Sequence, residues 1–147
     1  MFGYETSSYL PEVAINWWAI LAATAVAMII GSLWYGPLFG DRWMKLVGLK
    51  KKDAEKNWKV PMATMLAMAF VQAFVVRHII VYAAYFNGGM DLGVGLATGF
   101  WLFVGVALPL VLSSNMFARR SMDLTYIEAG NQLVTLLAIG AVLSTWE

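Results

Sequence analysis

Four polar side chains recur at helical spacing in the last apolar stretch of this chain. They occupy positions i, i+3, i+4 and i+7 and are Glu128, Asn131, Gln132 and Thr135. At about 100° per residue, these positions share one face of a helix. Such a face can form a hydrogen-bonded seam between helices, line a path or binding surface for a small molecule, or hold a catalytic carboxylate. We place the structural seam first and keep the other two uses open. Asn115, on the preceding apolar stretch, is expected at a depth similar to that of Glu128.

Arg77 and His78 interrupt the second apolar stretch. A lone Arg near the middle of a membrane helix costs on the order of 3 kcal/mol on insertion scales, so a polar partner is expected. Side chains at comparable depth on other segments are Glu12, Asn16 and Thr98. For Arg77, a structural and a functional role both stay open. His78 is the only histidine, and without Cys or a second His it gives weak support for a metal or haem site. We expect it to make an interhelical hydrogen bond.

The chain lacks the motifs of the common enzyme chemistries. It contains no Cys, no HExxH or CxxC spacing, no phosphate-binding loop and no Ser/His/Asp constellation. A net charge of +1 gives no indication of nucleic-acid binding. We therefore predict a protein that is not an enzyme, with no catalytic residue, cofactor or metal site and no nucleic-acid partner.

The apolar composition indicates that lipid surrounds the elements carrying these residues. Of the 147 residues, 61% are hydrophobic and 13% are charged, against about 45–50% and about 25% in soluble domains. A bilayer core about 30 Å thick requires about 20 apolar residues in a helix. The chain has four such runs, at 13–35, 61–86, 94–117 and 124–146. We predict an all-α integral membrane four-helix bundle, formed as a single transmembrane domain over residues 1–147.

The basic residues predict the orientation of this bundle. The linker 37–60 carries seven Lys or Arg residues, and the turn between the third and fourth runs carries Arg119 and Arg120. The N-terminal tail, the turn 87–93 and the C-terminus carry none. Because basic loops stay in the cytoplasm, we expect a multi-pass protein of the bacterial inner membrane with both termini outside. The lysines of the linker are expected to bind anionic lipids.

Aromatic residues gather where the first run ends. Trp34, Tyr35 and Trp43 are expected at the headgroup layer, where an amphipathic ring has one apolar and one wet side. Pro37 is expected to end the first helix, since its ring cannot continue the hydrogen-bond ladder. The apolar positions that follow it have helical spacing, which predicts a short amphipathic segment lying in the interface.

Small residues form stripes on two of the predicted helices. One stripe repeats every four residues and consists of Ala19, Ala23, Ala27 and Gly31, and Gly95 and Gly99 form a GxxxG pair. Small residues let helix backbones approach closely in lipid. We expect these stripes to pack within the bundle, with a homo-oligomer seam as the alternative.

Three blocks of the sequence resemble the bacterial family catalogued as domain of unknown function 1761. They are "INWWAILAATAVAMIIGSLWYGPLFGDRWMKLVG", "ALPLVLSSNMFARRS" and "YIEAGNQLVTLLAIGAVLSTW". The first block carries Asn16 and the most specific signature, Trp34-Tyr35-x-Pro37 followed by Gly40 and Trp43. Where members often have His in the polar pair of the closing helix, this chain has Gln132. The resemblance implies a small four-helix integral membrane protein and no particular activity.

Two functions rank highest for these features, and a membrane enzyme or haem protein centred on His78 and Glu128 ranks third. The first is a non-enzymatic membrane component that acts as a homo-oligomer or as an accessory subunit of a partner membrane protein. It predicts a dry interior in which every polar group has a protein partner. The alternative is a small-molecule or ion transporter or channel that uses the polar face of the fourth helix and Arg77. It predicts a wet cavity that reaches both clusters.

Overall fold

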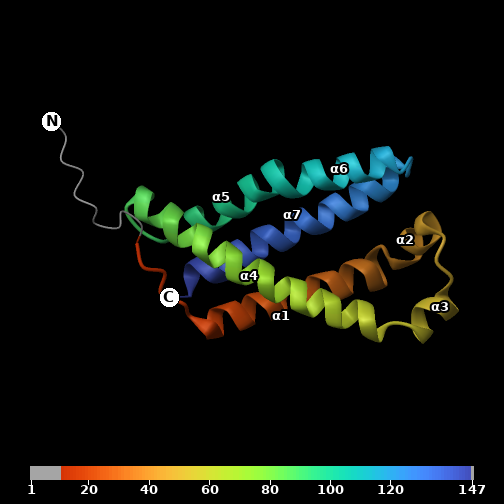
Figure 1. The fold of residues 1–147 in the computed structure, drawn as a ribbon, viewed down its shortest axis with the longest axis horizontal. Coiled ribbons are helices and arrows are strands. Elements are labelled where there is room, and N and C mark those ends of the chain that lie inside the picture. Colours follow the sequence, from red (N-terminus) through yellow and green to blue (C-terminus); the bar gives the residue numbers. More distant parts are fainter. Residues whose placement is uncertain (1–10, 147) are drawn as a thin grey trace.

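The computed structural model describes residues 11–146, which contain helices and no strand (Figure 1). The predicted domain also covers residues 1–10 and 147, which lie outside the described residues. The helices are α1 (Trp17–Leu33), α2 (Gly40–Val47), α3 (Lys51–Lys56), α4 (Lys59–Asn87), α5 (Leu92–Leu102), α6 (Leu108–Phe117) and α7 (Met122–Thr145). Two π-helical turns, η1 (Trp34–Leu38) and η2 (Phe103–Ala107), follow α1 and α5 directly.

Four helical stretches are long and apolar enough to cross a membrane. They are Trp17–Leu38, Lys59–Asn87, Leu92–Phe117 and Met122–Thr145, judged by length and composition. The prediction of an all-α chain with four such helices is confirmed.

Local sequence signals determine where several of these helices begin and end. The side chain of Asn16 accepts a hydrogen bond from the Ala19 amide, and Asp91 and Ser121 cap α5 and α7 in the same way. Each cap satisfies a backbone N–H that the first turn of a helix leaves without an intrahelical partner. Gly88 ends α4 in the left-handed region, at a φ of 82°, where a residue without Cβ is favoured.

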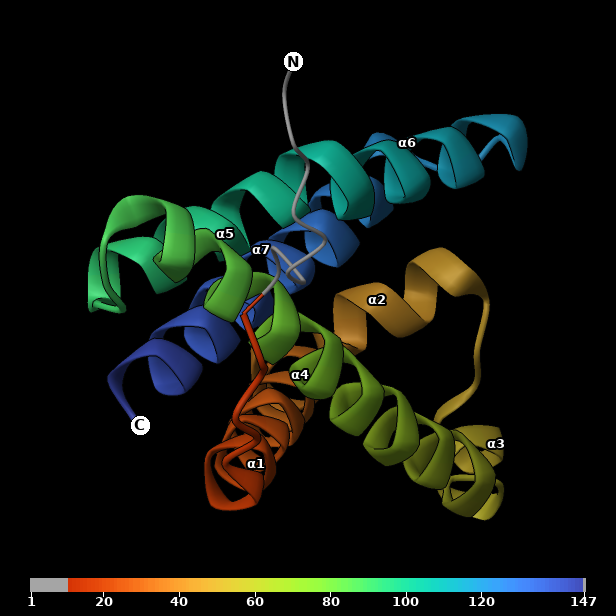
Figure 2. The same ribbon diagram turned by 60° about the vertical axis from the view of Figure 1, so that its left-hand side comes forward.

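Helix α7 is the central element of the bundle. Half of its most apolar window is buried, whereas α5 and α6 together bury 17% of theirs. In Figures 1 and 2, α7 lies between the pair α1 and α4 on one side and the pair α5 and α6 on the other. The apolar core joins α1, α4 and α7 through Ile20, Ile80 and Ile139, each with no exposed surface.

The small-residue stripes pack inside this chain. Ala19, Ala23 and Ala27 belong to the buried core. Gly95 and Gly99 lie directly on α7, where a Cβ on Gly95 would overlap the Gly140 carbonyl oxygen. Backbone-to-backbone contact of this kind is what a small-xxx-small pattern permits, and it makes α5 and α7 the most extensively packed pair of helices.

The basic segments lie at one end of the molecule. Helices α2 and α3 and the turn between α6 and α7 occupy that end in Figure 1. The start of α1, the turn between α4 and α5 and the end of α7 occupy the opposite end. At the basic end, the chain kinks at Gly36, whose φ and ψ are both −107°, just before Pro37. Helix α2 then returns toward α7, where Arg42 and Asp123 form an exposed ion pair of 2.7 Å.

Candidate functional site

The polar face of α7 lines two adjoining cavities. The larger has a volume of about 540 Å³, and Glu128 and Gln132 are part of its wall. The smaller has a volume of about 290 Å³ and is lined by Asn131, Gln132 and Thr135, together with residues of α1 and α4. The two cavities share Gly31, Met65 and Gln132. We call them together the α7 cleft.

Helices α4 and α6 diverge toward the basic end of the molecule (Figure 2), and residues of both helices line the larger cavity. Every residue of α4 from Lys59 to Met68 is exposed, whereas Ala73, Val76 and Ile80 further along the same helix are buried. Helix α6 packs against α7, and α4 packs against α1, α5 and α7. The methionines of the exposed half of α4, Met62 and Met65, form the side of the cleft that faces α7.

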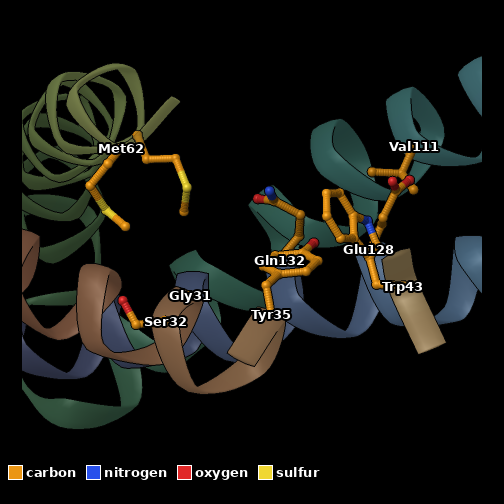
Figure 3. A pocket seen from close by; sticks show the side chains of 9 residues that line it. Gly31, Ser32, Tyr35, Trp43, Met62, Val111, Glu128 and Gln132 are labelled. Atoms are coloured by element: carbon orange, nitrogen blue, oxygen red, sulfur yellow. The ribbon is translucent and has the colours of Figure 1, made fainter. Parts of the chain in front are cut away.

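Aromatic residues of η1 and α2 form the wall beside Glu128. The rings of Tyr35 and Trp43 meet edge to face with centroids 5.3 Å apart. Their arrangement depends on Gly40, where a Cβ would lie 2.5 Å from the Tyr35 carbonyl oxygen. In Figure 3, Tyr35, Trp43, Glu128 and Gln132 gather on one side of the cavity, with Met62 on the other side.

Trp34 holds this wall against α7. Its Nε1 donates to the Ile127 carbonyl oxygen at 2.8 Å. Its ring lies on Gly130, where a Cβ would be 2.9 Å from Cζ2 of the indole. From the sequence, Trp34 is expected only as a headgroup anchor, and its contact with α7 was missed. Glycine two residues after Glu128 was the available signal, since it leaves room for a ring on the face of the helix.

Glu128 is half-buried and is held by Asn115 of α6. The Asn115 side chain is 2% exposed, and its Nδ2 donates to Glu128 Oε2 at 2.7 Å and to Thr125 Oγ1 at 3.2 Å. Arg120 Nη1 donates to the other end of the same amide, Asn115 Oδ1, at 3.5 Å. The side-chain donor to the carboxylate among the described residues is therefore a neutral amide, and it fixes the position of Glu128 at the cavity wall.

Asn131 lines the smaller cavity and has one buried polar atom without a described partner. The residue is 8% exposed, and its Nδ2 has no hydrogen-bond partner among the residues that the structure describes. An unsatisfied buried amide costs about 1–3 kcal/mol. Buried polar groups nearly always find a partner, so this amide nitrogen, which is covered by protein atoms next to the cavity, is a weak point in the packing of the cavity wall.

The comparisons with known proteins identify the family. The family profile described as "Protein of unknown function (DUF1761)" matches residues 18–144. The chain belongs to the DUF1761 family. No curated protein and no solved structure matches it. The signature of the first block, Trp34 to Trp43, thus coincides in this DUF1761 protein with the aromatic wall of the cleft.

Arg77 lies at the other end of α7 and lines neither cavity of the cleft. It is 5% exposed, and its Nη1 donates to the Leu143 carbonyl oxygen at 2.7 Å. Nη2 lies 3.4 Å from the Ala14 carbonyl oxygen, and Nη1 lies 3.4 Å from Met90 Sδ. Leu143 is in the last turn of α7, where carbonyls have no intrahelical donor and positive charge is favoured.

The other residues expected near Arg77 have local partners. Asn16 caps α1, and the Thr98 hydroxyl donates to the Val94 carbonyl oxygen at 2.8 Å. His78 Nδ1 donates to the carbonyl oxygen of Phe74, four residues earlier in α4, at 2.8 Å. The expectation of an interhelical hydrogen bond for His78 is therefore wrong. The residues from 11 to 146 contain no group of three or more His, Cys, Asp or Glu side chains that could hold a metal ion.

Proposed function

We propose that this DUF1761 protein is a multi-pass integral membrane protein that binds a small molecule in the α7 cleft and performs no catalysis. The four long apolar helices support a membrane location. Both basic segments lie at one end of the bundle, which supports an orientation with that end in the cytoplasm and both termini outside. A bacterial inner membrane, with the lysines of the linker over anionic lipid, is part of the same proposal.

The observation that carries the binding function is the pairing of the polar face with a cavity. Glu128, Asn131 and Gln132 could have closed a dry seam against a neighbouring helix, but they line open volume. The buried Asn131 amide is left without a described partner there. Small-molecule sites are mostly apolar clefts of about 300–1,000 Å³ with a few polar groups that fix orientation, and the α7 cleft has this composition.

Binding is favoured over the two functions inferred from sequence. A channel or transporter would require the cleft to reach Arg77, but Arg77 contacts carbonyls of α7 and of the segment before α1, about 15 residues or roughly 22 Å along α7 from Glu128. An oligomeric role was suggested by small-residue stripes, and these pack within the chain. An accessory role with a partner membrane protein is compatible with ligand binding.

Cysteine labelling tests whether the cleft is open to water. The chain has no Cys, so each variant carries one thiol. Gln132→Cys places it in the cleft, and Val134→Cys places it on the exposed outer side of the same helix, which faces lipid under this proposal. Thiols react as thiolates, which form poorly in apolar surroundings. With N-ethylmaleimide on membrane vesicles, we expect Gln132→Cys to react at least about tenfold faster than Val134→Cys. Equal protection of both thiols would mean a dry cleft and would refute the proposal.

A further inference from the structure

The chemistry of the larger cavity points to a class of ligand. We propose that the α7 cleft binds an amphipathic organic cation, whose charge lies between Glu128 and the rings of Tyr35 and Trp43. This inference rests on the proposed binding function and adds the charge and shape of the ligand.

The first argument is the state of Glu128. The ion pair Arg42–Asp123 is the one formed among the described residues, so Glu128 has no cationic side chain within ion-pairing distance there. Its described side-chain partner is the neutral amide of Asn115. Arg120 reaches the far end of that amide and does not line the cavity. A half-buried carboxylate is stabilised strongly by a cation, because the attraction is poorly screened away from water.

The second argument is the position of the aromatic rings. Tyr35 and Trp43 line the same cavity as Glu128, and their edge-to-face contact fixes both rings. Figure 3 shows the two rings and the carboxylate on one side of the cavity. A cation within about 6 Å of a Trp or Tyr face is attracted by the ring quadrupole, and quaternary ammonium ligands are commonly recognised by such rings next to a carboxylate.

The third argument is the rest of the lining, which carries no charge and is mostly apolar, with Ser32 and Gln132 as its polar members. Met62 lies across the cavity from Glu128 in Figure 3, and Met65 and Val111 also line the cavity. Methionine side chains adapt to irregular apolar shapes. No Lys or Arg lines the larger cavity, so an anion would meet Glu128 with no compensating group. These features select a ligand with an apolar body and a positive head.

Two hydrophobic ions of matched shape and opposite charge test this inference. Tetraphenylphosphonium and tetraphenylborate would be titrated calorimetrically into the full chain in phosphatidylglycerol nanodiscs, with empty nanodiscs subtracted. We expect saturable binding of the cation and weaker binding of the anion. Glu128→Gln should lower the affinity for the cation by about tenfold or more. Asp123→Asn is the matched control, because it removes an exposed carboxylate of the same helix outside the cavity, and it should leave the affinity within about twofold.

A second variant keeps the test decisive if Glu128→Gln fails to fold. Trp43→Leu retains an apolar side chain and removes the ring, so it should weaken binding of the cation several-fold and leave binding of the anion unchanged. Equal affinity for both ions, no binding of either ion, or full affinity in both variants overturns the cation inference. The proposed binding function fails separately, when Gln132→Cys is protected from N-ethylmaleimide.

The positive head could belong to a free cation or to a lipid ammonium group. Nanodiscs that also contain phosphatidylethanolamine distinguish these sources. A loss of tetraphenylphosphonium affinity that depends on Glu128 indicates competition by the lipid headgroup, whereas unchanged affinity indicates a free cation. Both results require the same carboxylate and rings, and an affinity that is independent of Glu128 in both lipids refutes the inference.

Discussion

Asn115 determines how Glu128 is presented to the cleft, because one buried amide joins α6 to two polar side chains of α7. Replacing it by Leu keeps a similar volume but removes the donor to Glu128 and Thr125. We expect Asn115→Leu to lower the free energy of unfolding by about 1–3 kcal/mol, since the half-buried carboxylate and the buried hydroxyl lose their described donor. Unfolding in detergent titrated with dodecyl sulfate and followed by circular dichroism measures the change.

Ser113→Ala is the control for that variant. Its hydroxyl is exposed and donates to the Leu110 carbonyl oxygen of its own helix, so its loss should change stability by no more than about 0.5 kcal/mol. An Asn115→Leu protein as stable as Ser113→Ala would show that the amide does not hold Glu128.

Spacing in the sequence was enough to place the polar residues of α7 on one face, because a helix of regular pitch converts positions i, i+3, i+4 and i+7 into neighbours. It could not indicate what that face meets. The described acceptors of Arg77 are main-chain carbonyls and a thioether, and every residue has a carbonyl, so no residue type marks such a partner. His78 likewise bonds a carbonyl of its own helix, an option that a search for polar side chains misses.

At the scale of helices, the contact of α5 with α7 depends on glycines that face each other. A Cβ on Gly95 would overlap the Gly140 carbonyl oxygen and the Ser144 hydroxyl, and a Cβ on Gly140 would overlap the Gly95 carbonyl oxygen. Backbone atoms cannot rotate away as side chains do, so the helices must separate. We expect Gly95→Ala to destabilise the protein by about 1–3 kcal/mol in the same unfolding titration.

The control lies in the same membrane-spanning stretch. A Cβ on Gly105 would meet nothing within 4 Å, so Gly105→Ala should be neutral or gain up to about 1 kcal/mol through reduced backbone freedom of the unfolded chain. If Gly95→Ala is tolerated as well as Gly105→Ala, the close backbone contact of α5 with α7 does not limit stability, and the packing argument is refuted.

Hydropathy located the four long helices because a spanning helix needs a continuous apolar stretch. Hydropathy did not show where two of these long helices are interrupted. The breaks at η1 and η2 depend on local backbone geometry, as at Gly36, and a single Pro or Gly in an apolar run does not reveal how many residues the distortion involves. The path of α2 back to α7 follows from the first break, which is why the aromatic wall of the cleft could not be derived from the sequence.

For the whole molecule, α4 and α6, which both line the larger cavity, diverge toward the basic end (Figure 2). This divergence is a property of how four helices pack together. The exposed half of α4 is as apolar in sequence as its buried half, since a helix in lipid and a helix in a core need the same residue types. Residue patterns therefore cannot distinguish a wall of the cleft from a surface covered by lipid.

The orientation of the protein in the membrane is also a property of the whole molecule, and it determines from which side of the membrane the cleft is accessible. The basic segments lie at one end of the bundle (Figure 1), and α4 and α6, which both contribute residues to the cleft, diverge toward that end (Figure 2). If that end is cytoplasmic, as the positive-inside bias favours, a ligand would enter from the cytoplasm or the inner leaflet. Lys51→Cys and Asn87→Cys place single thiols in exposed positions at opposite ends. An impermeant maleimide added to intact spheroplasts should label Asn87→Cys at once, and Lys51→Cys only after permeabilisation. Labelling of both thiols from one side would contradict the four-pass arrangement, and a reversed pattern would place the cleft on the outer face.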